Sequence, residues 1–211
     1  MSIATTAIRN PGFVSPAHDA QRVFRATLEA LARPTTGQPL LARVTPPAPL
    51  GPEAGAVVLA LCDEQTPVWL DAALRKSGEV ASWIRFHTGS RIVDAPGDAL
   101  FCVASCPSAM PALDALKTGS DEEPHLSATV LVDATAAKPV GAFLATGPGI
   151  RGSAEWDGAG CTRAFLDAWA ANNAMFPRGV DLLLAGEGVV RGIPRTTVLT
   201  EKTVLTEKEG A

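Results

Sequence analysis

The C-terminal part of the chain places a cation beside two hydroxyl groups, a combination suited to binding anions. Arg195, Thr196 and Thr197 follow the apolar run 189–193, which is typical of a strand. The arginine fork matches carboxylate and phosphate groups, and open α/β sheets often bind ligands where strands end. The triplet predicts contact with an anionic ligand or a partner. A carboxylate at an interface or the cap of a helix would also explain an arginine there.

A second candidate is the glycine-rich stretch Gly147-Pro148-Gly149-Ile150-Arg151-Gly152. Gly147 and Gly149 would let backbone N–H groups approach an anion, and Arg151 adds a positive charge. The lysine and hydroxyl residue of the phosphate loop Gly-x4-Gly-Lys-Ser/Thr are missing. We interpret the stretch as a tight turn after a strand, with phosphate binding as the alternative.

Among the histidines at 18, 87 and 125, His87 has the most suggestive surroundings. Arg85 and His87 gather donors at the expected end of a helix, just before Gly89. These two residues are therefore further candidates for contact with an anion or a partner. A cation near a helix C-terminus also interacts favourably with the helix dipole, which is the structural alternative.

No complete catalytic or metal-binding motif accompanies these candidates. The nucleophile elbow Gly-x-Ser-x-Gly is absent, and Cys102-x3-Cys106 has no second Cys or His pair at zinc spacing. We therefore expect no catalytic residue, no metal and no cofactor. The cysteines at 62, 102, 106 and 161 are expected to be reduced thiols, with Cys62 and Cys102 in apolar runs.

Composition argues against several classes of partner. The formal net charge is -4, from 18 basic and 22 acidic residues, so the overall positive charge that phosphate backbones require is missing and we expect no nucleic acid. No stretch approaches the roughly 20 apolar residues of a membrane span, and residues 1–6 do not resemble an export signal. We expect a soluble, cytoplasmic protein without membrane contact.

The first element expected to position the candidates is an amphipathic helix over residues 15–33, begun by Ser15-Pro16 and stopped by Pro34. Four apolar residues recur at helical spacing and are expected to face the core: Ala20, Phe24, Leu28 and Leu31. The charged residues fall on another face: Arg22, Arg25, Glu29 and Arg33.

Helices and strands should alternate further along the chain. Further helices are expected over 54–61 (strand being the alternative), 74–86 and 161–174, and strands over 66–70, 99–104, 129–132, 140–145, 180–184 and 189–193. Strands apolar on both faces need helices on both sides, which predicts a three-layer α/β/α fold with a mixed sheet. We expect an arm over 1–14, one domain over 15–200 and a tail over 201–211. A direct repeat, Thr-Val-Leu-Thr-Glu-Lys at 197–202 and 203–208, runs from the end of the domain into this tail.

Six segments, in this order, carry a resemblance to a known family: His18-Asp19-Ala20-Gln21-x-x-Phe24-Arg25, Thr66-Pro67-Val68-Trp69-Leu70, Arg85-Phe86-His87-Thr88, Gly147-Pro148-Gly149-Ile150, Phe176-Pro177-x-Gly179-Val180-Asp181 and Pro194-Arg195-Thr196-Thr197. Together they resemble the PhnH family, the small subunit of the bacterial carbon-phosphorus lyase core complex. The resemblance runs from about 16 to 197. No single segment is specific, but the ordered set is. The chain departs from the family at 124–129 and in its duplicated tail.

The resemblance implies a fold similar to that of pyridoxal-phosphate-dependent transferases, without their cofactor site. It implies a subunit of the alpha-D-ribose 1-methylphosphonate 5-triphosphate synthase, which uses ATP and a phosphonate and releases adenine in phosphonate catabolism. The implied partners are the other core subunits and a second copy, with Trp69, Trp83 or the Arg22, Arg25 and Arg33 helix face as candidate dimer contacts. The leading hypothesis is a structural or substrate-positioning subunit. The alternative is an autonomous nucleotide- or phosphonate-processing enzyme.

Overall fold

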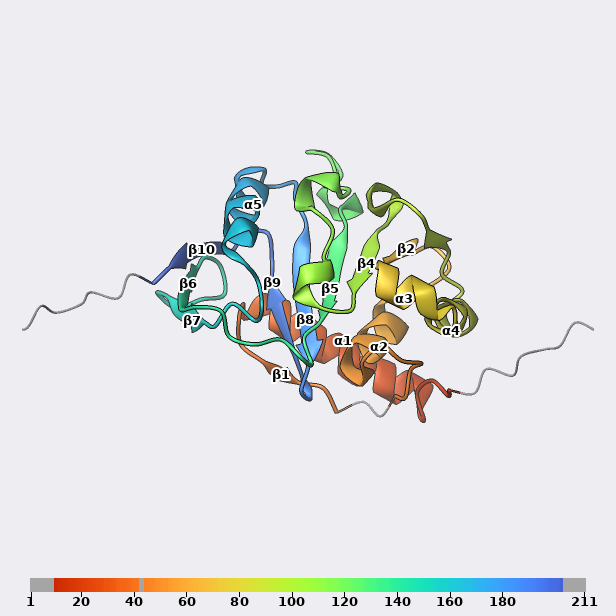
Figure 1. Cartoon of the computed structure of the whole chain (residues 1–211). Coiled ribbons are helices and arrows are strands. Elements are labelled where there is room, and N and C mark those ends of the chain that lie inside the picture. Colours follow the sequence, from red (N-terminus) through yellow and green to blue (C-terminus); the bar gives the residue numbers. More distant parts are fainter. Residues whose placement is uncertain (1–9, 42–43, 203–211) are drawn as a thin grey trace, which may run out of the picture.

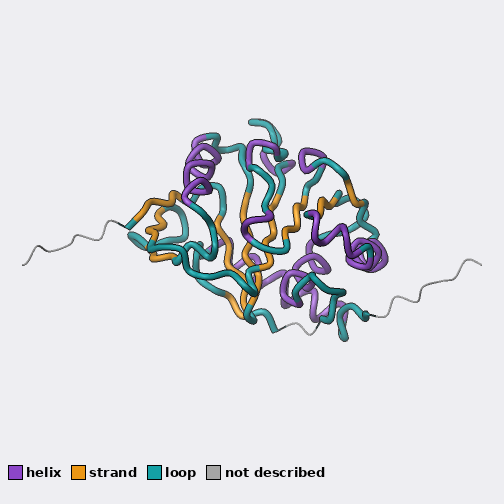
Figure 2. Tube along the Cα trace, in the orientation of Figure 1, coloured by secondary structure: helices purple, strands orange, loops and turns teal. Residues whose placement is uncertain are grey.

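A computed structural model describes residues 10–41 and 44–202, whose centre is a seven-stranded mixed sheet (Figures 1 and 2). The strand order is β1-β9-β8-β5-β4-β2-β3. The strands are β1 Gln38–Pro39, β2 Val68–Leu70, β3 Ile92–Val93, β4 Phe101–Ala104, β5 Thr129–Asp133, β8 Asp181–Gly186 and β9 Val189–Ile193. Strands β3, β2, β4, β5 and β8 run parallel, whereas β9 and β1 join antiparallel. The predicted α/β fold with a mixed sheet is confirmed.

Strands β4, β5 and β8 are buried on both faces because their apolar residues divide between two hydrophobic cores. Val103, Leu131 and Leu183 belong to the first core, while their neighbours Cys102, Val130 and Leu182 belong to the second. Successive side chains of a strand point to opposite faces, so continuous apolar runs require cover on both sides. The three-layer expectation followed from this pattern.

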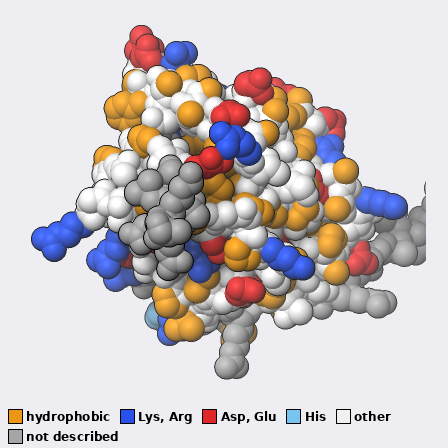
Figure 3. Space-filling view, turned by 60° about the vertical axis from the view of Figure 1, so that its left-hand side comes forward, with side chains coloured by type: hydrophobic (Ala, Val, Ile, Leu, Met, Phe, Trp, Pro, Cys, Tyr) orange, Lys and Arg blue, Asp and Glu red, His pale blue; other side chains and the backbone are white. Residues whose placement is uncertain are grey.

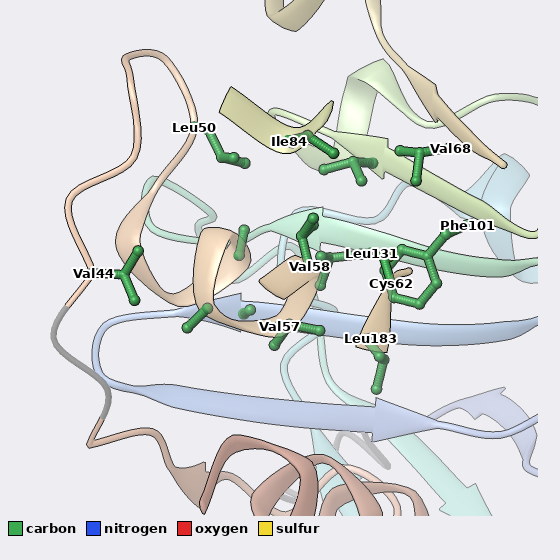
Figure 4. Packing of buried hydrophobic residues seen from close by; sticks show 14 of the residues in the cluster. Val44, Leu50, Val57, Val58, Cys62, Val68, Ile84, Phe101, Leu131 and Leu183 are labelled. Atoms are coloured by element: carbon green, nitrogen blue, oxygen red, sulfur yellow. The ribbon is translucent and has the colours of Figure 1, made fainter. Parts of the chain in front are cut away.

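The first core lies between the sheet and helices α1 (Pro16–Ala32), α2 (Pro52–Leu61), α3 (Ala72–Ser77) and α4 (Glu79–Thr88). Residues 54–58 of α2 are buried, and Val57 and Val58 pack in one cluster with Leu131 and Leu183 of the sheet (Figure 4). The expected helices over 15–33 and 54–61 are thus confirmed.

The face that α1 turns to the core differs from the prediction. Val23, Thr27 and Ala30 are buried, whereas Phe24 is 50% exposed and Leu28 is 56% exposed. The core therefore takes smaller side chains, and of the predicted inner stripe Leu31 packs against the first core while Phe24 and Leu28 lie to its side. Gly192 of β9 lets the backbone of α1 approach the sheet closely, because a Cβ at that position would lie 2.7 Å from the Ala30 carbonyl oxygen.

The helix predicted over 74–86 is divided at Gly78 into α3 and α4. Gly78 has a φ of 64°, a conformation that few other residues adopt, and it both ends α3 and precedes α4. Asp71 caps α3 by accepting a hydrogen bond from the Leu74 backbone N–H. Gly89, in the left-handed conformation, ends α4 where the sequence predicted a helix end.

The second core lies between the opposite face of the sheet, helix α5 (Arg163–Ala174) and a separate three-stranded sheet of order β10-β6-β7. Its strands are β6 Phe143–Thr146, β7 Ala154–Trp156 and β10 Val198–Glu201. The chain expected as a strand over 140–145 thus joins this smaller sheet, which lies beside the β9 end of the main sheet (Figure 1). Short 3-10 helices occupy Pro96–Asp98, Pro107–Ala109, Leu113–Ala115 and Pro124–Leu126.

The first copy of the C-terminal repeat supplies β10, and the second copy lies outside the described residues. Within 10–41 and 44–202, no helix has the length and hydropathy needed to cross a membrane.

Candidate functional site

Arg195 and Asp181 form a bidentate ion pair at the start of β8. The Arg195 backbone N–H donates to Asp181 Oδ1 at 2.7 Å, its Nε donates to the same oxygen at 3.2 Å, and its Nη2 donates to Oδ2 at 2.6 Å. The side chains are only 13% and 22% exposed. Bidentate, charge-assisted hydrogen bonds are strong and fix the relative orientation of the guanidinium and the carboxylate.

The remaining Arg195 donors bind two other segments. Nη1 donates to the carbonyl oxygens of Pro124 at 3.0 Å and Pro177 at 3.3 Å, and Nη2 donates to Ser127 Oγ at 2.5 Å. A guanidinium carries five N–H donors, and five such bonds to protein groups are present. We call these residues the Arg195 clamp: Arg195, Asp181, Ser127, Pro124 and Pro177. The geometry suits an arginine that positions protein segments.

The clamp lies at the amino edge of the parallel strands. Strand β9 runs antiparallel to β8, so its C-terminal end returns to the side where β8 begins. The sequence argument that placed Arg195 at the ligand-binding edge of the sheet is therefore wrong, because ligands of open α/β sheets bind at the carboxyl ends of the parallel strands. The direction of β9 reverses the conclusion.

Residues 195–197 are also fixed to helix α5. Trp169 Nε1 donates to the Thr197 carbonyl oxygen at 2.8 Å, and Asn173 Nδ2 donates to the Arg195 carbonyl oxygen at 2.8 Å. Thr197 is fully buried, and its hydroxyl has no hydrogen-bond partner among the described residues. Thr196 is half-buried. The triplet thus joins the end of β9 to the α5 layer.

The structure brings the glycine-rich stretch next to this triplet. A Cβ on Gly147 would lie 2.8 Å from the Thr196 carbonyl oxygen, and a Cβ on Gly149 would lie 2.2 Å from the Ala32 carbonyl oxygen at the end of α1. Both glycines have positive φ values. The interpretation as a tight turn is confirmed, because the Ile150 N–H donates to the Gly147 carbonyl oxygen. Arg151 is exposed.

Arg85 and His87 lie far from the clamp, on α4 beside the β2 end of the sheet (Figure 1). His87 Nε2 is 3.3 Å from the Asn10 carbonyl oxygen, which also accepts a hydrogen bond from Trp83 Nε1 at 2.9 Å. These two rings therefore hold the beginning of the described chain against α4. Arg85 is exposed and makes no ion pair with another described residue.

Two buried carboxylates at the carboxyl edge of the sheet were missed by the sequence argument. Asp71 accepts hydrogen bonds from the Ser105 backbone N–H at 2.6 Å and from Ser105 Oγ at 2.5 Å, which joins the ends of β2 and β4. Asp133 accepts from the Gly51 N–H at 2.7 Å, so it joins the end of β5 to the start of α2. Each aspartate ends an apolar run, which was the available signal. Both are engaged in holding loops.

A groove of about 820 Å³ lies between α5 and residues 107–118. Met110, Leu113, Phe165, Ala168 and Met175 contribute apolar surface to it. Of its lining residues in the described part of the chain, Asp114 alone is ionisable. Because no cation lines the groove, its chemistry favours a neutral apolar group over a phosphate or phosphonate.

The thiols and lysines are poorly placed for covalent catalysis. Burial raises the pKa of Cys102 to about 12 and that of Cys161, beside Asp157, to about 12, so both thiols stay protonated at neutral pH. The four described lysines, at 76, 117, 138 and 202, are all exposed rather than shielded as a Schiff-base lysine would be. In residues 10–41 and 44–202, no three His, Cys, Asp or Glu side chains are grouped as metal ligands.

Charged side chains on the surface are interspersed. On the face turned forward in Figure 3, the basic and acidic side chains alternate with hydrophobic ones and do not gather into one basic patch. This distribution agrees with the acidic overall charge and gives no footprint for a nucleic-acid backbone on that face.

Two comparisons with known proteins match almost the whole chain. Residues 11–200 match the family described as bacterial phosphonate metabolism protein (PhnH). The chain is also 40% identical over 196 residues to the alpha-D-ribose 1-methylphosphonate 5-triphosphate synthase subunit PhnH of Rhizobium meliloti (strain 1021). That alignment covers 93% of this chain and 98% of the relative. The range matched to the family contains every residue of the Arg195 clamp.

Proposed function

Because the chain belongs to the PhnH family, we propose that it is a structural or substrate-positioning subunit of an alpha-D-ribose 1-methylphosphonate 5-triphosphate synthase. In this role it takes part in the reaction of ATP with a phosphonate, with release of adenine, during phosphonate catabolism. The observation that carries the proposal is the 40% identity to a subunit of that synthase over 98% of the relative's length.

The geometry of the candidate residues supports the positioning role. All five donors of the Arg195 guanidinium bind protein groups, and Thr197 and Gly147 lie in close contact between elements. Arg85 and Arg151, by contrast, are exposed, and their side chains form no hydrogen bond or ion pair with the other described residues. We propose that any contact of this chain with an anionic substrate uses such residues, with neighbouring subunits supplying the rest of the site.

The test is assembly with the sister subunits encoded by the same organism. The purified full chain is mixed with them at micromolar concentration and separated by size-exclusion chromatography. We expect a stoichiometric complex that contains the chain. Separate elution of the folded chain and its sister subunits would overturn the proposal. The autonomous-enzyme alternative is addressed by calorimetric titration of the isolated chain with ATP and methylphosphonate, in which heat of binding followed by turnover would favour that alternative.

Two finer expectations also belong to the proposal. The first is a homodimer. Trp83 is excluded as a dimer contact because it is buried within its own chain. Trp69 is half-buried against the second core, which leaves little of it for a partner. The exposed Arg22, Arg25 and Arg33 face of α1 stays a candidate. The second is a likeness to pyridoxal-phosphate-dependent transferases without bound cofactor, for which an absorption scan lacking an internal aldimine band is the expected result.

A further inference from the structure

Helix α1 carries an apolar stripe whose centre, Phe24 and Leu28, is left exposed by its own fold. Phe24 and Leu28 are 50% and 56% exposed, although they are larger than Val23, Thr27 and Ala30, which face the core. Large apolar residues exposed side by side mark interaction surfaces more often than scattered single ones do. We call the surface formed by Ala20, Phe24, Leu28 and Leu31 the outer stripe.

The spacing of the outer stripe is that of a helix contact. Its members are four, four and three residues apart, so they lie on one face of α1 and extend over about 16 Å at 1.5 Å per residue. Ala20 and Leu31 are half-buried at its ends, and Phe24 and Leu28 are the protruding centre. This is the pattern of anchors with which an amphipathic helix enters an apolar groove on another protein.

The charges beside the outer stripe indicate the chemistry of the opposing surface. Arg25 lies next to Phe24, is exposed and has no ion-pair partner within the described part of the chain. Arg22 lies 3.8 Å from Asp19 and Arg33 lies 3.3 Å from Glu29, both at exposed positions. With Arg22 and Arg33 paired to acidic residues of the same helix, the surplus positive charge beside the stripe is that of Arg25, in a chain of net charge -4. It suits an apolar groove with an acidic rim.

A second copy of this chain fits the stripe less well. If two α1 helices packed antiparallel about a two-fold axis, the same flank of each helix would meet the other. Arg25 of both copies would then lie together, and this repulsion between like charges disfavours the pair. An acidic rim on a different subunit therefore complements the outer stripe better than a second α1 does.

We propose that the outer stripe of α1 is the surface through which this chain docks onto another subunit of the synthase, in an apolar groove edged by Asp or Glu. The inference rests on the proposed function, because it takes the partner from the same complex. It adds the surface and the kind of groove that receives it.

The test compares full-length variants for binding to the preassembled sister subunits. The double variant Phe24→Ser/Leu28→Ser removes the apolar anchors, and Arg25→Glu reverses the adjacent charge. Val140→Ser is the matched control, because Val140 is 52% exposed but lies outside the outer stripe, where its backbone N–H bonds to the Asp157 carbonyl oxygen next to the small sheet. Circular dichroism and thermal melting establish that each variant is folded.

We expect the double variant to bind at least about 10-fold more weakly, the loss of roughly 1.4 kcal/mol of binding free energy. Arg25→Glu should weaken binding several-fold and most strongly at low salt, whereas Val140→Ser should bind as the wild type does. Binding of the folded double variant with unchanged affinity would overturn the inference while leaving the proposed function intact. Loss of self-association without loss of complex binding would assign the stripe to a second copy and also overturn it. Failure of the wild-type chain itself to bind would overturn the proposed function, and this inference with it.

Discussion

The guanidinium of Arg195 forms a bidentate ion pair with the carboxylate of Asp181, and the backbone N–H of Arg195 donates to the same carboxylate. Asp181 is the first residue of β8 and Arg195 lies just after the last residue of β9, and these two strands pair antiparallel. With Pro124, Ser127 and Pro177 added, one side chain ties four segments together. Arg195, which the sequence predicted as a contact for an anionic ligand or a partner, instead joins segments of the chain at the amino edge of the sheet.

Replacing Arg195 by alanine should therefore lower stability more than an ordinary surface change does. Asp181 would be left largely buried without its counter-ion, and we expect a loss of about 2 to 4 kcal/mol in the free energy of unfolding. Denaturant titration measures this loss. Asp181→Asn and the double variant complete a thermodynamic cycle, in which the two single losses should not add. Full stability of Arg195→Ala, with reduced binding of ATP or a phosphonate, would show instead that the arginine serves a ligand.

Gly149→Ala should be strongly destabilising because the new methyl group has no room. Its Cβ would lie 2.2 Å from the Ala32 carbonyl oxygen, at a φ of 82°. We expect a loss of about 2 kcal/mol or more in the free energy of unfolding. Gly152→Ala is the matched control, since its φ is 73° but nothing lies within 4 Å of the added Cβ. It should lose only about 1 kcal/mol, from backbone strain alone. Equal losses in both variants would show that packing of the turn against α1 contributes nothing.

The thiols should divide into one accessible group and three protected ones. Cys106 is half-buried, whereas Cys62, Cys102 and Cys161 are buried. A thiol-specific chromogenic reagent at pH 8 should titrate one thiol rapidly in the native protein and four after denaturation. Cys106→Ser should abolish the fast phase. Rapid reaction of two or more thiols in the folded protein would contradict the described packing.

The same burial predicts how stability depends on alkaline pH. Burial raises the pKa of Cys102 and Cys161 from 9.0 to about 12, so the folded state retains protons that the unfolded state releases. This contribution to stability is complete below about pH 9 and is lost as pH rises toward 12. The free energy of unfolding should therefore fall across that window, and Cys102→Ala should reduce the slope. A slope that Cys102→Ala and Cys161→Ala each leave unchanged would assign the pH dependence to other groups.

Elements with local signals were predictable from the sequence. Ser15-Pro16 and Pro34 bound the first helix, and the apolar runs of β4, β5 and β8 identify strands because both of their faces are buried. The core face of α1 was not predictable. The most regular apolar spacing in this helix passes through Phe24 and Leu28, which are exposed. A periodic pattern shows that apolar residues share one face of a helix, but it does not show whether that face packs on the core or lies beside it.

The break at Gly78 and the place of Arg195 depend on tertiary structure. Residues 74–86 keep a helical apolar pattern, and glycine inside such a pattern is compatible with a continuous helix. The location of Arg195 depends on the direction of β9, which becomes defined only when β9 pairs with β8. Asp181 was visible as part of a motif, but its partnership with a residue 14 positions away was not.

The central claim, that the chain completes a multi-subunit synthase, is tested most directly by adenine release. The sister subunits are incubated with ATP and methylphosphonate with and without this chain, and free adenine is measured. We expect adenine release by the assembled complex, little release when the chain is omitted, and none from the chain alone. Full release without the chain, or release by the chain in isolation, would contradict the account.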